Sequence, residues 1–379
     1  MNDKYIFIII VLSCSIFGLF LGFMKNNVEN DTKIEEYSIK KDINITSDKK
    51  KEKMDEKDEE IDEEEESDIE DEIERHENKK KIIGKKLRIA AGYSTDNKYC
   101  YPTLVAMTSL AETAGPKTYY EIYVLHTPDF TKDNKEILRS VEKRHYNKCS
   151  VILINMGNRF VGLKVDHLAT SAYYRLVFHD VVPNHKRIIY MDGDTMVRHD
   201  LTDLINLDMK DKYILGFLDS VQSAIEKFGI KNATVLCSGI LLIDLESLRK
   251  FNYTDKINDF IEKNRDRLNQ HDQTIINVVF QDKLAPIPPK YGMWAFADEW
   301  SVDEHLGFQH SWNNYNKKEF YEAWRDPSIV HWIWPKPFWS NYYPAFNEEW
   351  WNNAIKTGYI DQINEFVRIY KRYSLLFLR

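Results

Sequence analysis

Positions 187 to 197 read Arg187-Ile188-Ile189-Tyr190-Met191-Asp192-Gly193-Asp194-Thr195-Met196-Val197, an apolar run that ends in two acidic residues around one glycine. In extended backbone, residues i and i+2 point to the same side, so Asp192 and Asp194 can offer oxygens to one point. Gly193 has no side chain that would keep a ligand from the backbone. A buried strand that ends in this way indicates a divalent-metal site at the carboxyl edge of an α/β sheet. An ordinary acidic turn is the alternative, since Asp-Gly is also favourable in turns.

Charge is distributed unevenly along the 379 residues, which are numerous enough for one large or two ordinary domains. The net charge is −8, and 43% of the residues are hydrophobic. Residues 25–86 hold 15 Lys/Arg and 23 Asp/Glu; subtracting these from the totals of 52 and 60 leaves 37 of each sign elsewhere. The remainder is therefore neutral and lacks the basic excess of nucleic-acid-binding proteins, so we expect no nucleic-acid partner.

An uncharged run of twenty residues, 5–24, lies near the start of the sequence. As a helix it would be about 30 Å long, the thickness of a bilayer's hydrocarbon core. A cleaved signal peptide is the alternative, but the run passes directly into Lys25 without a small-x-small cleavage site. We expect residues 1–24 to form a short cytoplasmic tail and an uncleaved transmembrane anchor. This arrangement predicts a single-pass type II membrane protein whose carboxyl part lies in the lumen of the Golgi or endoplasmic reticulum.

Residues 25–86 are polar and low in complexity, with almost no aromatic residues. Such a segment cannot bury enough apolar surface to fold alone, and we expect a disordered, acidic stem. A calcium-binding or partner-binding acidic tail is the other interpretation. Sequons at Asn30, Asn44, Asn232 and Asn252 are usable only if the carboxyl part faces a eukaryotic secretory lumen.

From Leu87 to the end of the chain, residues 87–379, strand-like and helix-like patterns alternate. This alternation predicts an α/β domain with a mostly parallel, doubly wound sheet, in which ligands bind beyond the carboxyl ends of the strands. Asp96 and the pair Asp192/Asp194 fall on that edge. Expected strands cover 87–93, 119–125, 150–155, 187–191, 213–218 and 239–243, and expected helices cover 101–114, 133–141, 170–178, 272–280, 348–357 and 360–375.

Two further patterns leave alternatives open. The region 291–351 is rich in Trp, Tyr, Phe and Pro and weak in periodicity, which is typical either of a core built around loops or of a sugar-stacking surface. The cysteines form no CxxC pair and no metal-ligand spacing. Apart from Cys14 in the apolar run, they are either free core thiols or one disulfide and an odd thiol: Cys100, Cys149 and Cys237.

Across about residues 87–339 the chain resembles retaining glycosyltransferases of family 8, which have the GT-A nucleotide-sugar fold. Asp192-Gly193-Asp194 matches the family's DxD motif, and the resemblance implies that both carboxylates hold a Mn²⁺ that bridges the donor's diphosphate. Val330–Phe338 (VHWIWPKPF) is similar to the HxxGxxKPW block, although it has one residue fewer between His and Lys, no central glycine, and Phe as its last residue. By this match His331 is the third metal ligand and Lys336 contacts the diphosphate.

Smaller matches occur in the family's order. The resemblance implies a uracil contact for Asp96, a phosphate or sugar-hydroxyl contact for Arg175, and a sugar contact for Asp219. His271–Asn277 matches the DQDxxN block with Thr in place of the second Asp, which would put Asp272 and Gln273 near the anomeric centre. Cys237 replaces the asparagine of an Asn-Ala-Gly block, so one sugar contact differs from the family pattern.

The resemblance implies a Mn²⁺-dependent hexosyltransferase that moves a hexose from a UDP-sugar to a hydroxyl acceptor on a glycan, lipid or protein, with retention at the anomeric carbon. An amide is a poor nucleophile, so we expect Gln273 to position the sugar while the acceptor enters on the face of the leaving phosphate. Two alternatives remain: a glycogenin-like self-glucosylating primer, and a catalytically silent, membrane-tethered protein that binds nucleotide sugars or carbohydrate.

Overall fold

The computed structural model describes Gly84 and residues 86–163, 169–219, 223–296, 299–308, 315–333, 335–339 and 344–376, all within one compact unit, Ile69–Arg379. The predicted anchor, residues 1–24, and all but two residues of the predicted stem lie outside this description. In the part of the chain that is described, no helix combines the length and the apolar character needed to cross a bilayer.

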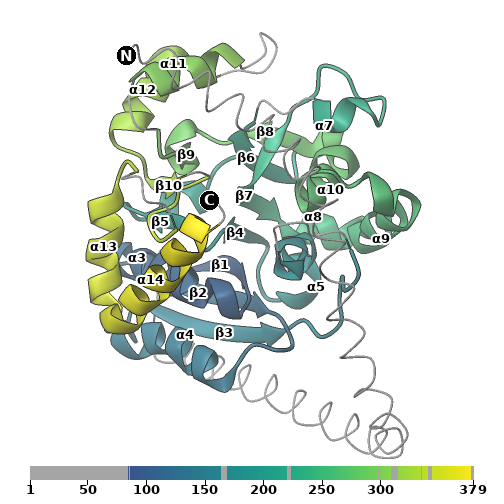
Figure 1. The fold of residues 1–379 in the computed structure, drawn as a ribbon. Coiled ribbons are helices and arrows are strands. Elements are labelled where there is room, and N and C mark those ends of the chain that lie inside the picture. The colour runs from purple at the N-terminus through teal and green to yellow at the C-terminus, as the bar shows by residue number, and fades with distance from the viewer. Residues whose placement is uncertain are drawn as a thin grey trace, which may run out of the picture. The chain divides into compact units, whose positions relative to one another are not determined.

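Seven strands form the central sheet: β1 (Leu87–Thr95), β2 (Thr118–His126), β3 (Cys149–Asn155), β4 (Arg187–Met191), β6 (Ile214–Leu218), β7 (Leu236–Asp244) and β8 (Leu284–Pro286). Their order is β3-β2-β1-β4-β7-β6-β8 (Figure 1). All adjacent pairs are parallel except those that β7 makes with β4 and β6. The predicted α/β architecture with a mostly parallel sheet is therefore confirmed.

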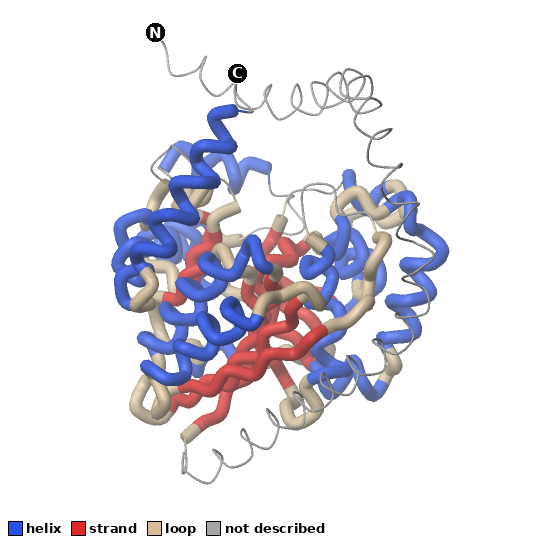
Figure 2. The backbone as a smooth tube through the Cα atoms, turned by 60° about the horizontal axis from the view of Figure 1, so that its bottom comes forward, coloured by secondary structure: helices blue, strands red, loops and turns tan. Residues whose placement is uncertain are grey.

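Side chains along each strand alternate between two covered faces of the sheet. In β1, Ile89 and Ala91 belong to the core that α3 (Cys100–Thr113) and α4 (Lys132–Arg144) help to form, whereas Ala90 belongs to the core of the opposite face. Figure 2 shows helices on both sides of the strands. The opposite face is covered by η2 (Thr170–Val177), α5 (Phe178–Val181), α8 (Leu245–Lys250), α9 (Tyr253–Asn264) and α10 (His271–Val279).

A second sheet, which the sequence did not predict, has three short strands in the order β5-β10-β9: β5 (Thr195–Val197), β9 (Met293–Trp294) and β10 (Ile329–His331). β10 is antiparallel to β5 and parallel to β9. One core cluster joins this sheet to α3, α13 (Asn347–Lys356) and α14 (Ile360–Leu376). A neighbouring cluster joins β9 to α11 (Glu299–Phe308) and α12 (Lys317–Arg325).

Aromatic residues of the region 291–351 contribute mainly to these two clusters. Trp332 and Trp350 are fully buried, and Trp294, Trp324 and Trp339 are partly buried against the same cores. For the described tryptophans, the interpretation as a core built around loops is therefore confirmed. Shorter helical turns complete the chain: η1 (Asn97–Tyr99), α6 (Thr202–Ile205), α7 (Ser223–Glu226), η3 (Arg265–Arg267), η4 (Gln281–Lys283) and η5 (Pro289–Tyr291).

Two local predictions are wrong in detail. β4 covers Arg187–Met191 as predicted, but the extended backbone expected through Asp192 and Asp194 is instead a turn, in which Thr195 N donates to Asp192 O at 3.2 Å. The chain turns there because β5 leaves the central sheet to pair with β10. The predicted helix at 170–178 is instead the 3₁₀ helix η2 followed by α5. A segment this short gains little from helix propensity, so tertiary contacts decide its form.

Candidate active site

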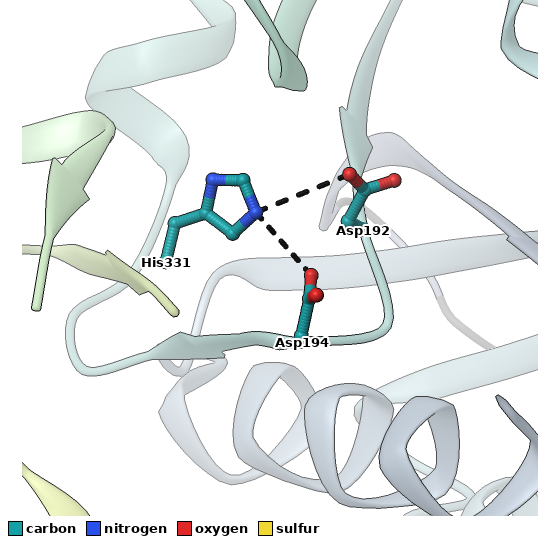
Figure 3. Close-up of side chains that lie close together, drawn as sticks. All are labelled: Asp192, Asp194 and His331. Carbon is teal, nitrogen blue, oxygen red and sulfur yellow. Dashed lines mark ion pairs between the residues drawn. The ribbon is translucent and has the colours of Figure 1, made fainter. Parts of the chain in front are cut away.

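Three predicted metal ligands converge beyond the carboxyl end of β4. One ligand atom each from Asp192, Asp194 and His331 lie within 4.8 Å of one another. Figure 3 shows the two carboxylates directed toward the imidazole: His331 Nε2 is 3.3 Å from Asp194 Oδ1 and 3.9 Å from Asp192 Oδ2. The acidic turn and the metal site were posed as alternatives, but the turn is what brings the carboxylates together.

Backbone pairing in the small sheet places His331 beside the turn. His331 lies opposite Thr195 in the β10–β5 pair, and Trp332 N donates to Asp194 O at 3.1 Å. The position of the imidazole is therefore set by main-chain hydrogen bonds and does not depend on a flexible loop.

Each aspartate has one oxygen held closely by protein donors and one directed toward His331, and the second oxygen of Asp192 also accepts from Arg175 Nη1 at 3.2 Å. Asp192 Oδ1 accepts from Tyr190 Oη at 2.6 Å and lies 2.9 Å from Arg175 Nη2. Asp194 Oδ2 pairs with Lys336 Nζ and accepts from Tyr99 Oη at 3.4 Å. Asp194 Oδ1 is buried and, among the described residues, has an ion-pair contact with His331 Nε2 at 3.3 Å but no partner in hydrogen-bond geometry. A buried acceptor without such a partner, beside an imidazole and a second carboxylate, fits a divalent cation with oxygen and nitrogen ligands.

Neighbouring charges keep Asp194 ionised. Burial raises the pKa of Asp194, but Lys336 and His331 outweigh burial and lower that pKa below its usual range. Burial likewise lowers the pKa of His331, but Asp194, with a contribution from the Cys237 thiol, raises it to about 10. A metal-ligating imidazole must be neutral, so a bound cation and the proton on His331 would compete.

The predicted metal ligands Asp192, Asp194 and His331 are called the metal cluster below. Arg175 connects this cluster to Asp272. Its guanidinium contacts Asp192, donates to Ser238 O at 2.6 Å and to Ala172 O at 2.8 Å, and lies 3.0 Å from Asp272 Oδ2. Burial lowers the pKa of Arg175, but Asp192 and Asp272 together raise it above its usual value. Arg175 therefore carries a permanent charge that bonds to protein acceptors, whereas the family resemblance assigned it a contact with the donor.

Gln273 is held at both ends of its amide. Oε1 accepts from Ser238 N at 3.1 Å, and Nε2 donates to Asp219 Oδ2 at 3.0 Å and to Gln270 Oε1 at 3.1 Å. Both N–H groups are therefore used in holding neighbours. Asp272 precedes it at the start of α10 and is 2% exposed; its burial, in spite of Arg175, raises the pKa of this carboxyl. The structure thus groups Asp219, Asp272 and Gln273 next to the metal ligands.

Asp96 is linked to Asp194 through Tyr99, and Lys336 pairs with Asp194 directly. Asp96 Oδ1 accepts from Tyr99 N at 2.8 Å and caps η1, so it fixes the residue whose hydroxyl reaches Asp194. Burial raises the pKa of Asp96. The Lys336 ammonium is 6.0 Å from the ring centre of Tyr99 and 5.8 Å from that of Trp339. Despite its shortened loop, Lys336 therefore reaches the metal cluster.

Glycines fit the site for a steric reason that the sequence did not reveal. A Cβ on Gly239 would lie 2.2 Å from His331 Cε1 and 2.9 Å from Asp192 Oδ2. At Gly193 a Cβ would lie 2.5 Å from Thr103 Oγ1, so the missing side chain lets the turn pack on α3. This contact explains the glycine without the predicted approach of a ligand to the backbone. Tyr99, Tyr190 and Gln270 were also missed, because each acts through another side chain and none lies in a motif that we recognised.

Cys100, Cys149 and Cys237 are buried thiols and none of them is in a disulfide in the described part of the chain, which confirms the first of the two alternatives for them. Cys237 lies beside His331, and its contact raises the imidazole pKa. The replacement of the family's asparagine therefore places a thiol next to the predicted metal ligands.

Comparison with solved structures defines the class by its fold. The galactosyltransferase LgtC, solved with donor and acceptor sugar analogs, aligns with a TM-score of 0.58 at 20% identity, covering 71% of this chain and 96% of LgtC. The glycosyltransferase GlyE of Streptococcus pneumoniae TIGR4 aligns with a TM-score of 0.52 at 20% identity, covering 76% of this chain and 64% of GlyE. Both are glycosyltransferases of the GT-A α/β type, and this chain has their fold.

The family model described as Glycosyl transferase family 8 matches residues 91–342, and the chain belongs to that family. It is therefore a glycosyltransferase. General stress protein A of Bacillus subtilis is 29% identical over 238 residues, 61% of this chain and 76% of that protein. GlyE is 23% identical over 211 residues, and the match spans 51% of this chain but only 47% of GlyE.

Proposed function

We propose that the protein is a retaining hexosyltransferase that uses a UDP-sugar donor, a hydroxyl acceptor and Mn²⁺. The observation that carries the proposal is the convergence of Asp192, Asp194 and His331 around a buried carboxylate oxygen that has no partner in hydrogen-bond geometry among the described residues, in a chain of glycosyl transferase family 8. A nucleotide-sugar donor and a glycosyl acceptor are implied by that family. The sugar and the acceptor are left to the experiment below.

Asp192, Asp194 and His331 would hold the cation, which when bound neutralises the charge that develops on the departing diphosphate. Lys336 adds a point charge next to the cation site, since its ammonium pairs with Asp194. Asp96 contacts the uracil in this proposal, and Asp219 accepts from a hydroxyl of the donor sugar. Arg175 keeps Asp192 and Asp272 at a fixed separation, because it contacts both carboxylates.

Gln273 positions the donor sugar rather than attacking it. Its amide is a weak nucleophile, and its N–H groups are directed at Asp219 and Gln270. The acceptor oxygen then bonds to the anomeric carbon on the face from which the phosphate oxygen leaves. The acceptor's proton passes to that phosphate oxygen, so the configuration is retained and charge is balanced.

The full-length chain, incubated with Mn²⁺ and a panel of UDP-sugars, tests this proposal. Release of UDP with one donor, dependent on Mn²⁺ and absent in Asp194→Ala, supports it. Binding of UDP without turnover of any donor, in the presence of hydroxyl acceptors, contradicts the transfer reaction and favours the silent binding protein. Sugar attached to the chain's own tyrosines identifies a self-glucosylating primer instead.

We also propose that residues 5–24 anchor the protein in a membrane of the Golgi or endoplasmic reticulum with residues 87–379 in the lumen. The length and apolar character of that run support the anchor. The two sequon asparagines of the described chain, Asn232 and Asn252, are exposed, as glycan attachment requires. Digestion of intact vesicles with protease tests the orientation: loss of residues 87–379 without detergent contradicts it.

A further inference from the structure

Hydrogen bonds hold the two oxygens of Asp192 unequally. Oδ1 has two short contacts, Tyr190 Oη at 2.6 Å and Arg175 Nη2 at 2.9 Å. Oδ2 has the longer contact with Arg175 Nη1 at 3.2 Å, and it is the oxygen that faces His331 Nε2. The carboxylate is thus fixed with Oδ1 held by two short contacts, while Oδ2, which has the longer Arg175 contact, is directed at His331.

We propose that Tyr190, and more weakly Tyr99, are positioning residues of the metal centre, each of which restricts one aspartate to a single metal-facing oxygen. Tyr99 Oη donates to Asp194 Oδ2 at 3.4 Å, the oxygen that also pairs with Lys336 Nζ, and Asp194 Oδ1 then faces His331. The inference rests on the proposed function, because it assumes that a divalent cation binds among Asp192, Asp194 and His331. It goes beyond that function by assigning the control of ligand geometry to two phenols.

Tyr190 is well suited to this task because its ring cannot move easily. It is fully buried on β4, whose backbone pairs with β1 on one side and β7 on the other. The Arg175 guanidinium lies 4.6 Å from the centre of its ring, and the Phe178 ring lies 5.7 Å away. A hydroxyl on so constrained a ring orients Asp192 at little cost in side-chain entropy.

Restriction to one oxygen per carboxylate has a consequence for the choice of cation. Ca²⁺ takes six to eight oxygen ligands and readily accepts both oxygens of a carboxylate, whereas smaller cations demand near-octahedral geometry. Two aspartates that each present a single oxygen therefore favour Mn²⁺ over Ca²⁺. Release of Asp192 from Tyr190 would let its carboxylate rotate and offer both oxygens.

Tyr190→Phe in the full-length chain tests this role, because it keeps the ring and removes only the hydroxyl. We expect Mn²⁺ to bind about tenfold more weakly, measured by titration calorimetry without nucleotide, as is typical when a group that orients a metal ligand is lost. Ca²⁺ binding should weaken less, so the ratio of the two dissociation constants narrows. Tyr99→Phe should shift the ratio in the same direction by a smaller factor, because its hydrogen bond is longer.

Tyr93→Phe is the matched control. Tyr93 is also fully buried on a neighbouring strand, but its hydroxyl is directed at Met191 Sδ, 3.9 Å away, and not at a carboxylate. This variant should leave both dissociation constants unchanged. Circular dichroism melts in the absence of metal establish that each variant is folded. If Tyr190→Phe is unfolded, the ratio of the Mn²⁺ and Ca²⁺ dissociation constants of Tyr99→Phe tests the positioning role instead.

Unchanged Mn²⁺ affinity in folded Tyr190→Phe overturns the positioning role while leaving the proposed function intact. Equal weakening for Mn²⁺ and Ca²⁺ also overturns it, because a general loss of structure would act on both. A wild-type protein that binds neither cation, alone or with saturating UDP, overturns both proposals at once.

Discussion

The seven-stranded sheet and the three-stranded sheet each supply part of the metal cluster, but they are assembled from different kinds of contact. β1, β2 and β3 follow one another in the chain with one α-helix between each pair, and their pairs extend over seven to nine residues. β5 and β10 pair over three residues, although two-fifths of the folded domain separates them in sequence.

This difference shows where the site is vulnerable. Asp192 follows a strand of the large sheet, His331 ends a strand of the small one, and Asp194 lies at the junction between them. Damage to the large sheet should lower the stability of the whole domain. Damage to the small sheet should also separate the metal ligands from one another.

Removal of the residue at the junction should have the largest effect on activity. Asp194→Ala should lower kcat roughly a thousandfold, since a bound cation contributes several kcal/mol to transition-state stabilisation and each 1.36 kcal/mol is tenfold in rate. The measurement is steady-state release of UDP. Asp211→Ala, which alters a 68% exposed aspartate outside the Asp192–Asp194–His331 cluster, is the control. Near wild-type turnover in Asp194→Ala would contradict the assignment.

Two equivalent cavity-forming substitutions, one in each sheet, distinguish a loss of stability from a loss of metal binding. Ile122 in β2 and Ile329 in β10 are both fully buried in the same core cluster. Truncation of either to Ala should lower the free energy of unfolding by about 3 kcal/mol, measured by urea titration. Only Ile329→Ala should also weaken Mn²⁺ binding, because it loosens the strand that ends in His331. Equal metal affinities in the two variants would show that the small sheet does not set the ligand geometry.

A methyl group added at two glycines of the large sheet tests how β7 packs against His331 of the small sheet. Gly239→Ala should cost about 2 kcal/mol of stability and displace His331, because the new Cβ would lie 2.2 Å from His331 Cε1. Gly216→Ala in β6 would meet Leu241 Cδ2 at 3.0 Å, an apolar neighbour that can shift. Metal titration should therefore separate the two variants, and a preserved metal affinity in folded Gly239→Ala would contradict the packing argument.

Ion pairs at the outer end of β5 should have the smallest effect. Arg198 follows β5 and contacts Glu349 and Asp326, each at 2.8 Å. Both acidic partners are largely exposed, so Arg198→Met should lower stability by at most about 1 kcal/mol, with a smaller difference at high salt. Metal affinity should not change. Thermal melts at two salt concentrations check this, and a salt-independent loss would point to packing of the Arg198 side chain instead.

Local sequence patterns predicted six of the seven strands of the large sheet, because each of those six carries an apolar run long enough to recognise, whereas β8 has only three residues and was missed. Strands 87–93, 119–125 and 150–155 were found as β1, β2 and β3. β5, β9 and β10 have two or three residues each, too few for a period to be visible, so the small sheet was missed.

The candidate site was likewise predicted from local patterns only in part. Asp192 and Asp194 were found from their own pattern, whereas His331 and Lys336 came from the family resemblance, since no local signal links them to an aspartate. The partners of Arg175 were not predicted either. Its contact with the donor was inferred from the motif, and burial between Asp192 and Asp272 is a property of the folded chain alone.

The pairing of β5 with β10 also bears on how the protein is made. Lys336 and Asp194, which meet at the metal cluster, are separated by 142 positions. We expect contacts this distant in sequence to form late in folding, because closing so long a loop costs chain entropy before the contact stabilises it. A ribosome-bound chain that has extended only as far as the large sheet would carry both aspartates but neither His331 nor Lys336. Nascent chains should therefore have no complete metal site until the last third of the protein has emerged.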